Sequence, residues 1–230
     1  MNHIPADADT ALRMPLPESL TATGVIAVLR APHWSEFEPV VTTLVENGVP
    51  AVELTTTTPF ALRAVPALRT ALKGSGILIG LGTVTTVAAA QAAVAAGVDF
   101  IVTPTAEPAV VDVAQAARIP VLPGALTPTE ALRVWSAGAS AVKLFPAATV
   151  GPSYLRHLRG PFPNLPIVPS GGYGVAEIPE WIRAGAVAVS LGSSLIGDAF
   201  DGDLDGLARR ARHAVDQVAE ARGGRPEARS

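Results

Sequence analysis

The stretch AGASAVKLF, residues 137–145, combines the two signals that decide the fold of this chain. Gly138 follows an amphipathic segment and is placed to end a helix, because glycine adopts the left-handed conformation common at helix C-termini. A short apolar run comes next and predicts a strand that is buried on both faces. Lys143 is the one charged residue of this stretch, and a charge inside a core is costly unless it has a partner or a function.

The same pattern recurs along the chain, at Asn47-Gly48-Val49, Ala96-Gly97-Val98 and Ala184-Gly185-Ala186. Eight apolar runs alternate with segments long enough for helices; they lie at residues 25–29, 51–56, 77–82, 99–103, 121–124, 141–145, 167–170 and 186–191. Such alternation predicts an α/β protein with a parallel sheet. Eight units in about 200 residues favour a closed (β/α)8 TIM barrel over an open sheet. No G-x-G-x-x-G follows the first run, which also disfavours a dinucleotide-binding sheet.

The predicted barrel domain covers residues 16–222. A short leading helix is expected over residues 16–21, where it would close the bottom of the barrel. Thr127-Pro128-Thr129-Glu130 reads as a capping box, so another helix begins there. Residues 1–15 and 223–230 are expected to be disordered tails.

Composition excludes several classes of function. The chain has 230 residues, of which 49% are hydrophobic and 16% charged, as expected for one compact domain. A net charge of −3 offers no basic surface to nucleic acid or to an anionic membrane. The chain has no cysteine, and its four histidines show no metal-ligand spacing, so neither a metal site nor a cofactor is predicted. The absence of a signal-peptide pattern and of a long apolar stretch favours a cytoplasmic protein.

Three charged side chains are predicted to meet at one end of the barrel. Side chains of a barrel strand alternate between the lumen and the helix layer. Lys143 on the sixth run and Glu53 on the second are therefore expected to point into the lumen, while Arg30 ends the first run. The carboxyl ends of the strands carry the active sites of barrel enzymes.

A buried lysine suits covalent catalysis. Burial disfavours an ammonium ion, and a neutral amine attacks carbonyl carbons to form Schiff bases. Glu53 would shuttle protons, directly or through water. The alternative is a buried ion pair between Lys143 and Glu53 that takes part in no reaction.

Two glycine loops predict an anion site. Ser170-Gly171-Gly172 follows the seventh run, and Gly192-Ser193 follows the eighth. Glycines allow backbone N–H groups to approach a phosphate, and barrels commonly bind phosphate between these two loops. Alternatively, the glycines only form tight turns.

Further polar groups are expected at the ends of the third and fourth runs. Thr83 ends the third run and Pro104 follows the fourth, where neighbouring hydroxyls would hold a carboxylate or a sugar hydroxyl. Thr83 is also a candidate helix N-cap. Phe145 would shield the amine of Lys143 from water.

Taken together, these motifs resemble one known family: the class I aldolases for 2-keto-3-deoxy-6-phosphogluconate, 4-hydroxy-2-oxoglutarate and 2-keto-3-deoxy-6-phosphogalactonate. The similar segments, in order, are VIAVLR (25–30), NGVPAVELT (47–55), GLGTV (80–84), FIVTP (100–104), IPVLPGALTPTE (119–130), AVKLFPA (141–147), PSGG (169–172) and LGSSL (191–195). The resemblance implies a Schiff base on Lys143, proton transfer by Glu53, and a pyruvate pocket that includes Arg30, Thr83, Pro104 and Phe145. It also implies phosphate binding by Ser170, Gly171, Gly172, Gly192 and Ser193, a homotrimer, and no metal or other cofactor.

One departure concerns the substrate. The phosphogluconate enzymes usually carry an arginine that contacts the substrate carboxylate where this chain has Thr57, and Arg30 is a candidate to supply that charge. The expected reaction is cleavage of a 2-keto-3-deoxy-6-phospho sugar acid to pyruvate and glyceraldehyde 3-phosphate. The alternatives are an aldolase for 4-hydroxy-2-oxoglutarate or another unphosphorylated 2-keto acid, a barrel isomerase or synthase without a covalent step, and a non-catalytic sugar-acid-binding barrel.

Overall fold

The computed structural model describes residues 13–223, and the α/β class predicted from the sequence is confirmed. The strands are short and parallel; they are β1 (Val25–Leu29), β2 (Ala51–Thr55), β3 (Leu78–Gly82), β4 (Phe100–Val102), β5 (Val121–Leu122), β6 (Gly124–Ala125), β7 (Val142–Leu144), β8 (Ile167–Pro169) and β9 (Val189–Leu191). The predicted tails lie outside the described residues, except for residues 13–15 and 223.

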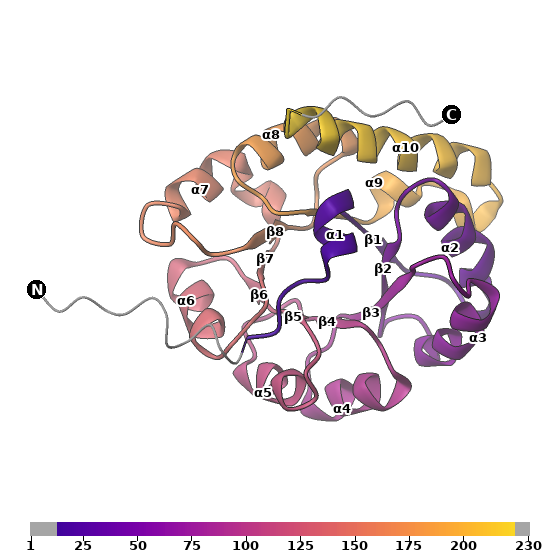
Figure 1. The fold of residues 1–230 in the computed structure, drawn as a ribbon, viewed down its shortest axis with the longest axis horizontal. Helices are drawn as coiled ribbons and strands as arrows, with labels where there is room; N and C mark the ends of the chain where they lie inside the picture. The colour runs from indigo at the N-terminus through magenta and orange to yellow at the C-terminus, as the bar shows by residue number, and fades with distance from the viewer. Residues whose placement is uncertain (1–12, 224–230) are drawn as a thin grey trace, which may run out of the picture.

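The helices surround the strands, as Figure 1 shows. They are α1 (Glu18–Thr23), α2 (Phe37–Glu46), α3 (Ala64–Ala71), α4 (Val87–Ala96), α5 (Pro108–Ala116), α6 (Pro128–Ser136), α7 (Gly151–Leu158), α8 (Ile178–Arg183), α9 (Ser193–Ile196) and α10 (Leu204–Ala221). Within residues 13–223, none of them is both long and apolar enough to cross a membrane.

The strands form two parallel sheets. The larger has the order β5-β4-β3-β2-β1-β9, and the smaller has the order β6-β7-β8. A single parallel bridge between Ser170 and Ser190 connects the end of β8 to β9. The one strand predicted over residues 121–124 is divided into β5 and β6 by Pro123, which has no N–H group to donate to a sheet.

The local signals for helix ends are confirmed. Gly48, Gly97, Gly138 and Gly185 all have positive φ angles between 75° and 102°, in the region that favours glycine. Thr127 and Glu130 form the predicted capping box at the start of α6. The leading helix is present two residues later than predicted, because Pro17 occupies its N-cap position.

Buried side chains form two separate clusters. The larger fills the layer between strands and helices; α10, for example, contributes Leu207, Ala211, Ala214 and Val218 to it. The smaller lies on the other face of the strands, near their amino ends, and contains Ile26, Phe100, Leu122 and Val168. Leu20 of α1 belongs to this second cluster, so the leading helix covers the amino ends of the strands (Figure 1).

Candidate active site

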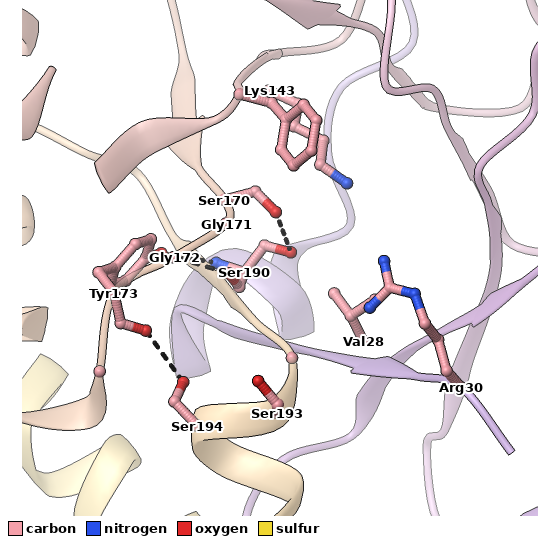
Figure 2. A pocket seen from close by; sticks show the side chains of 13 residues that line it. Val28, Arg30, Lys143, Ser170, Gly171, Gly172, Tyr173, Ser190, Ser193 and Ser194 are labelled. Atoms are coloured by element: carbon pink, nitrogen blue, oxygen red, sulfur yellow. Dashed lines mark hydrogen bonds between the residues drawn. The ribbon is translucent and has the colours of Figure 1, made fainter. Parts of the chain in front are cut away.

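A cavity of ≈ 510 Å³ opens at the carboxyl ends of β1, β7, β8 and β9 (Figure 2). Eight of the predicted site residues line it: Arg30, Lys143, Phe145, Ser170, Gly171, Gly172, Gly192 and Ser193. They come from segments as distant in the chain as Arg30 and Ser193. The sheet brings them together because the carboxyl ends of parallel strands meet at one edge.

Lys143 lines this cavity and forms a buried pair with Glu53, which is not itself among the lining residues. Nζ of Lys143 lies 3.4 Å from Oε1 of Glu53, and the two side chains are only 8% and 1% exposed. The other carboxylate oxygen, Oε2 of Glu53, has no hydrogen-bond partner among the described residues. A Cβ atom on Gly82 would overlap this carboxylate, so glycine at that position makes room for it. Oε2 of Glu53 is therefore available to accept a hydrogen bond close to the amine of Lys143.

An aromatic ring covers the amine from one side. The ring centroid of Phe145 lies 5.5 Å from Nζ of Lys143. A side chain on Gly171 would start 2.8 Å from that ring, so the glycine lets the loop after β8 pass beneath Phe145. The ring of Phe145 is therefore close to the amine, and its role as a shield against water stays a prediction.

The two glycine loops both line the cavity. Gly171 and Gly172 have φ angles of 90° and 86°, and Gly192 occupies the N-cap position of α9. The first N–H groups of a helix have no acceptor within it and commonly bind anions. A Cβ atom on Gly192 would lie 3.6 Å from Nη1 of Arg30, so the guanidinium is next to this loop. Among the described residues, Arg30 has no hydrogen-bond or ion-pair partner.

The comparison with known proteins agrees with this geometry. The family described as KDPG and KHG aldolase matches residues 16–209. The chain belongs to this family. A probable 2-dehydro-3-deoxy-6-phosphogalactonate aldolase of Rhizobium meliloti is 38% identical over 186 residues, which are 80% of this chain and 85% of the relative. The 2-dehydro-3-deoxy-6-phosphogalactonate aldolase of Escherichia coli is 34% identical over 76% of this chain and 85% of its own length.

Two solved structures extend the similarity to three dimensions. One, described as a native KDPGal structure, has a TM-score of 0.80 and 31% identity, and the alignment covers 86% of this chain and 96% of the other. The KDPG aldolase of Legionella pneumophila, with pyruvate captured as a covalent carbinolamine, has a TM-score of 0.78 and 26% identity over 85% of this chain and 96% of its own. The predicted family and the predicted class of enzyme, an aldehyde-lyase, are confirmed.

The aldolase cavity also contains residues that the sequence did not reveal. Tyr173 donates a hydrogen bond to the carbonyl of Pro169 (2.7 Å) and accepts one from the N–H of Ser190 (3.2 Å). Burial raises the pKa of the Tyr173 hydroxyl far above its ordinary value, so it stays neutral. Ser194 donates to the carbonyl of Tyr173 (3.0 Å) and ties the two glycine loops together. Alternation along β9 would have found Ser190, and Ser194 lies in the second glycine loop, but no local pattern marks Tyr173.

Thr83 and Pro104 are not among the residues that line this cavity, and their roles stay predictions. Thr83 has a φ angle of 60° and is not a helix N-cap. The prediction that Thr83 caps a helix is wrong, because Thr86 caps α4 by accepting a hydrogen bond from the N–H of Ala89 at 3.2 Å.

Among the described residues, the aldolase has no group of three or more histidine or carboxylate side chains placed to hold a metal ion.

Proposed function

We propose that the aldolase cleaves a 2-keto-3-deoxy-6-phospho sugar acid to pyruvate and glyceraldehyde 3-phosphate through a Schiff base on Lys143. The observation that carries this proposal is the buried pair of Lys143 and Glu53, 3.4 Å apart, beneath a cavity with two glycine loops. The names of the relatives support a phosphorylated sugar acid as the substrate.

The chemical steps follow from the positions of these groups. The unprotonated amine of Lys143 attacks the C2 ketone of the substrate, and loss of water gives an iminium ion. Glu53, through a water molecule, removes the proton of the C4 hydroxyl as the C3–C4 bond breaks. The electrons of that bond pass into the iminium and form an enamine. Protonation at C3 and hydrolysis release pyruvate and restore the amine.

Two groups of residues would hold the two ends of the substrate. The backbone of Gly171, Gly172 and Gly192, with the hydroxyls of Ser170 and Ser193, would bind the phosphate. Arg30, Thr83, Pro104 and Phe145 would form the pocket for the pyruvyl end, with Arg30 facing the carboxylate. Binding at the remote phosphate places the scissile bond against the amine.

We infer that residues 16–222 form one closed (β/α)8 barrel. Only Pro123 separates β5 from β6, and the bridge between Ser170 and Ser190 joins the two sheets at their other ends; both features support closure. We further propose that the enzyme is a cytoplasmic homotrimer, as the family resemblance implies. Light scattering in solution tests the trimer.

Reductive trapping tests the chemistry. Incubation with pyruvate and borohydride should leave one stable adduct, which peptide mass spectrometry assigns to Lys143. The chain has only one other lysine, Lys73, so the assignment is simple. An adduct elsewhere, or none, would refute the Schiff-base mechanism and favour a barrel enzyme without a covalent step. Turnover of both C4 epimers, with and without phosphate, then defines the substrate; no turnover of any of them would favour a binding protein.

A further inference from the structure

Two buried hydroxyls hold the peptide groups on either side of Arg30. Oγ1 of Thr55 donates to the carbonyl of Leu29 at 3.1 Å, and Oγ1 of Thr58 accepts from the N–H of Ala31 at 3.1 Å. Both threonines are buried, with exposures of 0% and 2%. The backbone of Arg30 is therefore fixed at both ends, while its side chain is exposed.

These two hydrogen bonds lie just beyond the last backbone pair of β1 and β2. The parallel pairing of β1 with β2 ends at Leu29 and Leu54, so Arg30 has no registered partner of its own. Arg30 lines the cavity, and Figure 2 shows its guanidinium directed toward the space below Nζ of Lys143. Arg30 is the first residue after β1, where pairing with β2 no longer holds the backbone. The direction in which its side chain enters the cavity therefore depends on the two threonine hydroxyls, which together form a clamp on its backbone.

Thr57 extends the same network. The hydroxyls of Thr55 and Thr57 lie 2.8 Å apart. Because Thr55 gives its single proton to the carbonyl of Leu29, Thr57 is the donor in this pair. The segment forms a turn, in which the N–H of Thr58 donates to the carbonyl of Thr55 (3.0 Å). Thr56 connects this turn to the residue after β3 by donating to the carbonyl of Thr83 (2.9 Å).

We propose that Thr55 and Thr58, supported by Thr57, are positioning residues that aim Arg30 at the anionic substrate. The inference rests on the proposed function, because Arg30 needs an anion to bind.

The test is a set of double-mutant cycles measured by steady-state kinetics. Thr55→Val and Thr58→Val remove a hydroxyl at nearly constant shape, and Thr55→Ser and Thr58→Ser keep it. Each is made alone and in the Arg30→Ala background. Thr70→Val on α3, whose hydroxyl bonds to the carbonyl of Pro66, is the control for loss of a threonine hydroxyl elsewhere. Borohydride trapping with pyruvate is measured for every variant.

We expect each valine variant to raise KM by roughly tenfold with kcat changed less than twofold, the scale of one buried hydrogen bond. The serine variants should restore KM, and neither valine should have a further effect once Arg30 is alanine. An equal rise in KM in both backgrounds, or no rise at all, would overturn the proposal. If a buried valine prevents folding, Thr57→Val decides: this residue is exposed, and the same dependence on Arg30 is expected at about threefold. Failure of wild-type trapping would instead count against the proposed function.

Discussion

The two ends of the strand interior have opposite character, although the same strands build both. Near the amino ends, the inner residues are apolar and packed under α1. Two positions further along the same strands, the inner residues are polar or small and face the cavity or the buried pair. The pairs, amino end first, are Ala51 and Glu53, Ala141 and Lys143, Val168 and Ser170, and Ala188 and Ser190.

The residues that stabilise the fold and the residues placed for catalysis therefore lie at opposite ends of the strands. The amino-end cluster buries apolar surface and has no titratable group. The carboxyl end gives up that packing for an amine, a carboxylate and a cavity. Substitutions at the amino end should therefore change the free energy of unfolding, and those at the carboxyl end should change catalysis.

The largest effect is expected from Lys143→Met. Loss of the nucleophile should lower kcat/KM by at least about 10⁴-fold, on the scale of other nucleophile deletions. The variant should also lose about 3–5 kcal/mol in the free energy of unfolding, because Glu53 would be left buried without its partner, so the rate is measured on the folded enzyme. Coupled pyruvate detection measures the rate, and Lys73→Met is the control for loss of an exposed lysine. Substantial residual activity would contradict covalent catalysis.

Phe100→Ala tests the amino end. Its fully buried ring occupies the space that a side chain on Gly80 would need. Truncation should cost about 3–5 kcal/mol in the free energy of unfolding, while kcat of the folded enzyme changes little. Urea denaturation measures the loss, and Gly80→Ala in the same variant should recover part of it. A large fall in kcat at full folding would break the proposed separation.

Glu53→Gln should lower kcat by about 10²- to 10³-fold, the usual contribution of a general acid–base group. The amide keeps the size of the carboxylate but does not accept a proton. Trapping with pyruvate should still occur, but more slowly. Rapid-quench measurement of adduct formation distinguishes this from loss of Lys143 function, and an unchanged kcat would remove Glu53 from the mechanism.

Gly172→Ala tests the phosphate loop. The residue has a φ angle of 86°, and a Cβ atom there would lie 2.8 Å from Cβ of Ala148. The displaced loop should raise KM for phosphorylated substrates by roughly tenfold, with less effect on unphosphorylated ones. Gly74→Ala is matched in conformation, with a φ angle of 83°, but has no neighbour within 4 Å. Equal changes in the two variants would argue against phosphate at this loop.

The smallest effect concerns a carboxylate on the surface. Bonds from the backbone N–H groups of Thr127 and Leu126 lower the pKa of Glu130 below its ordinary value. Its contribution to stability is therefore present above that ordinary value and is lost as the pH falls through the lowered one. Glu130→Gln should cost about 0.5 kcal/mol at neutral pH and less in acid. Thermal unfolding between pH 3 and pH 7 checks this trend, with the exposed Glu38→Gln as a control; a difference that grows in acid would contradict it.

Local signals in the chain were sufficient for most of the fold. Positive φ angles at Gly97 and Gly138 follow from the left-handed conformation that ends a helix, which depends on neighbouring residues alone. Strand ends were less predictable. The last predicted run, 186–191, forms a strand only over Val189–Leu191, because pairing depends on where the neighbouring strands begin and end.

The sequence also predicted some features of the candidate site and missed others. Lys143 and Glu53 could be named from the sequence because a charge in an apolar run stands out, and alternation gives the direction of its side chain. The distance of 3.4 Å between their charged groups could not be predicted, because it depends on how β2 and β7 are placed across the strand interior. Tyr173 and the clamp on Arg30 have no local signal, since their partners lie on other strands.

The sequence by itself determined the alternation of strands and helices, the ends of the helices and the two residues of the buried pair. Only the tertiary structure decided which residues share the cavity, that Thr86 rather than Thr83 caps α4, and that threonines of β2 and its turn fix the arginine of β1. The physical reason is range. Backbone conformation and side-chain alternation are set by near neighbours, whereas hydrogen bonds between strands require the positions of groups that are distant in the chain.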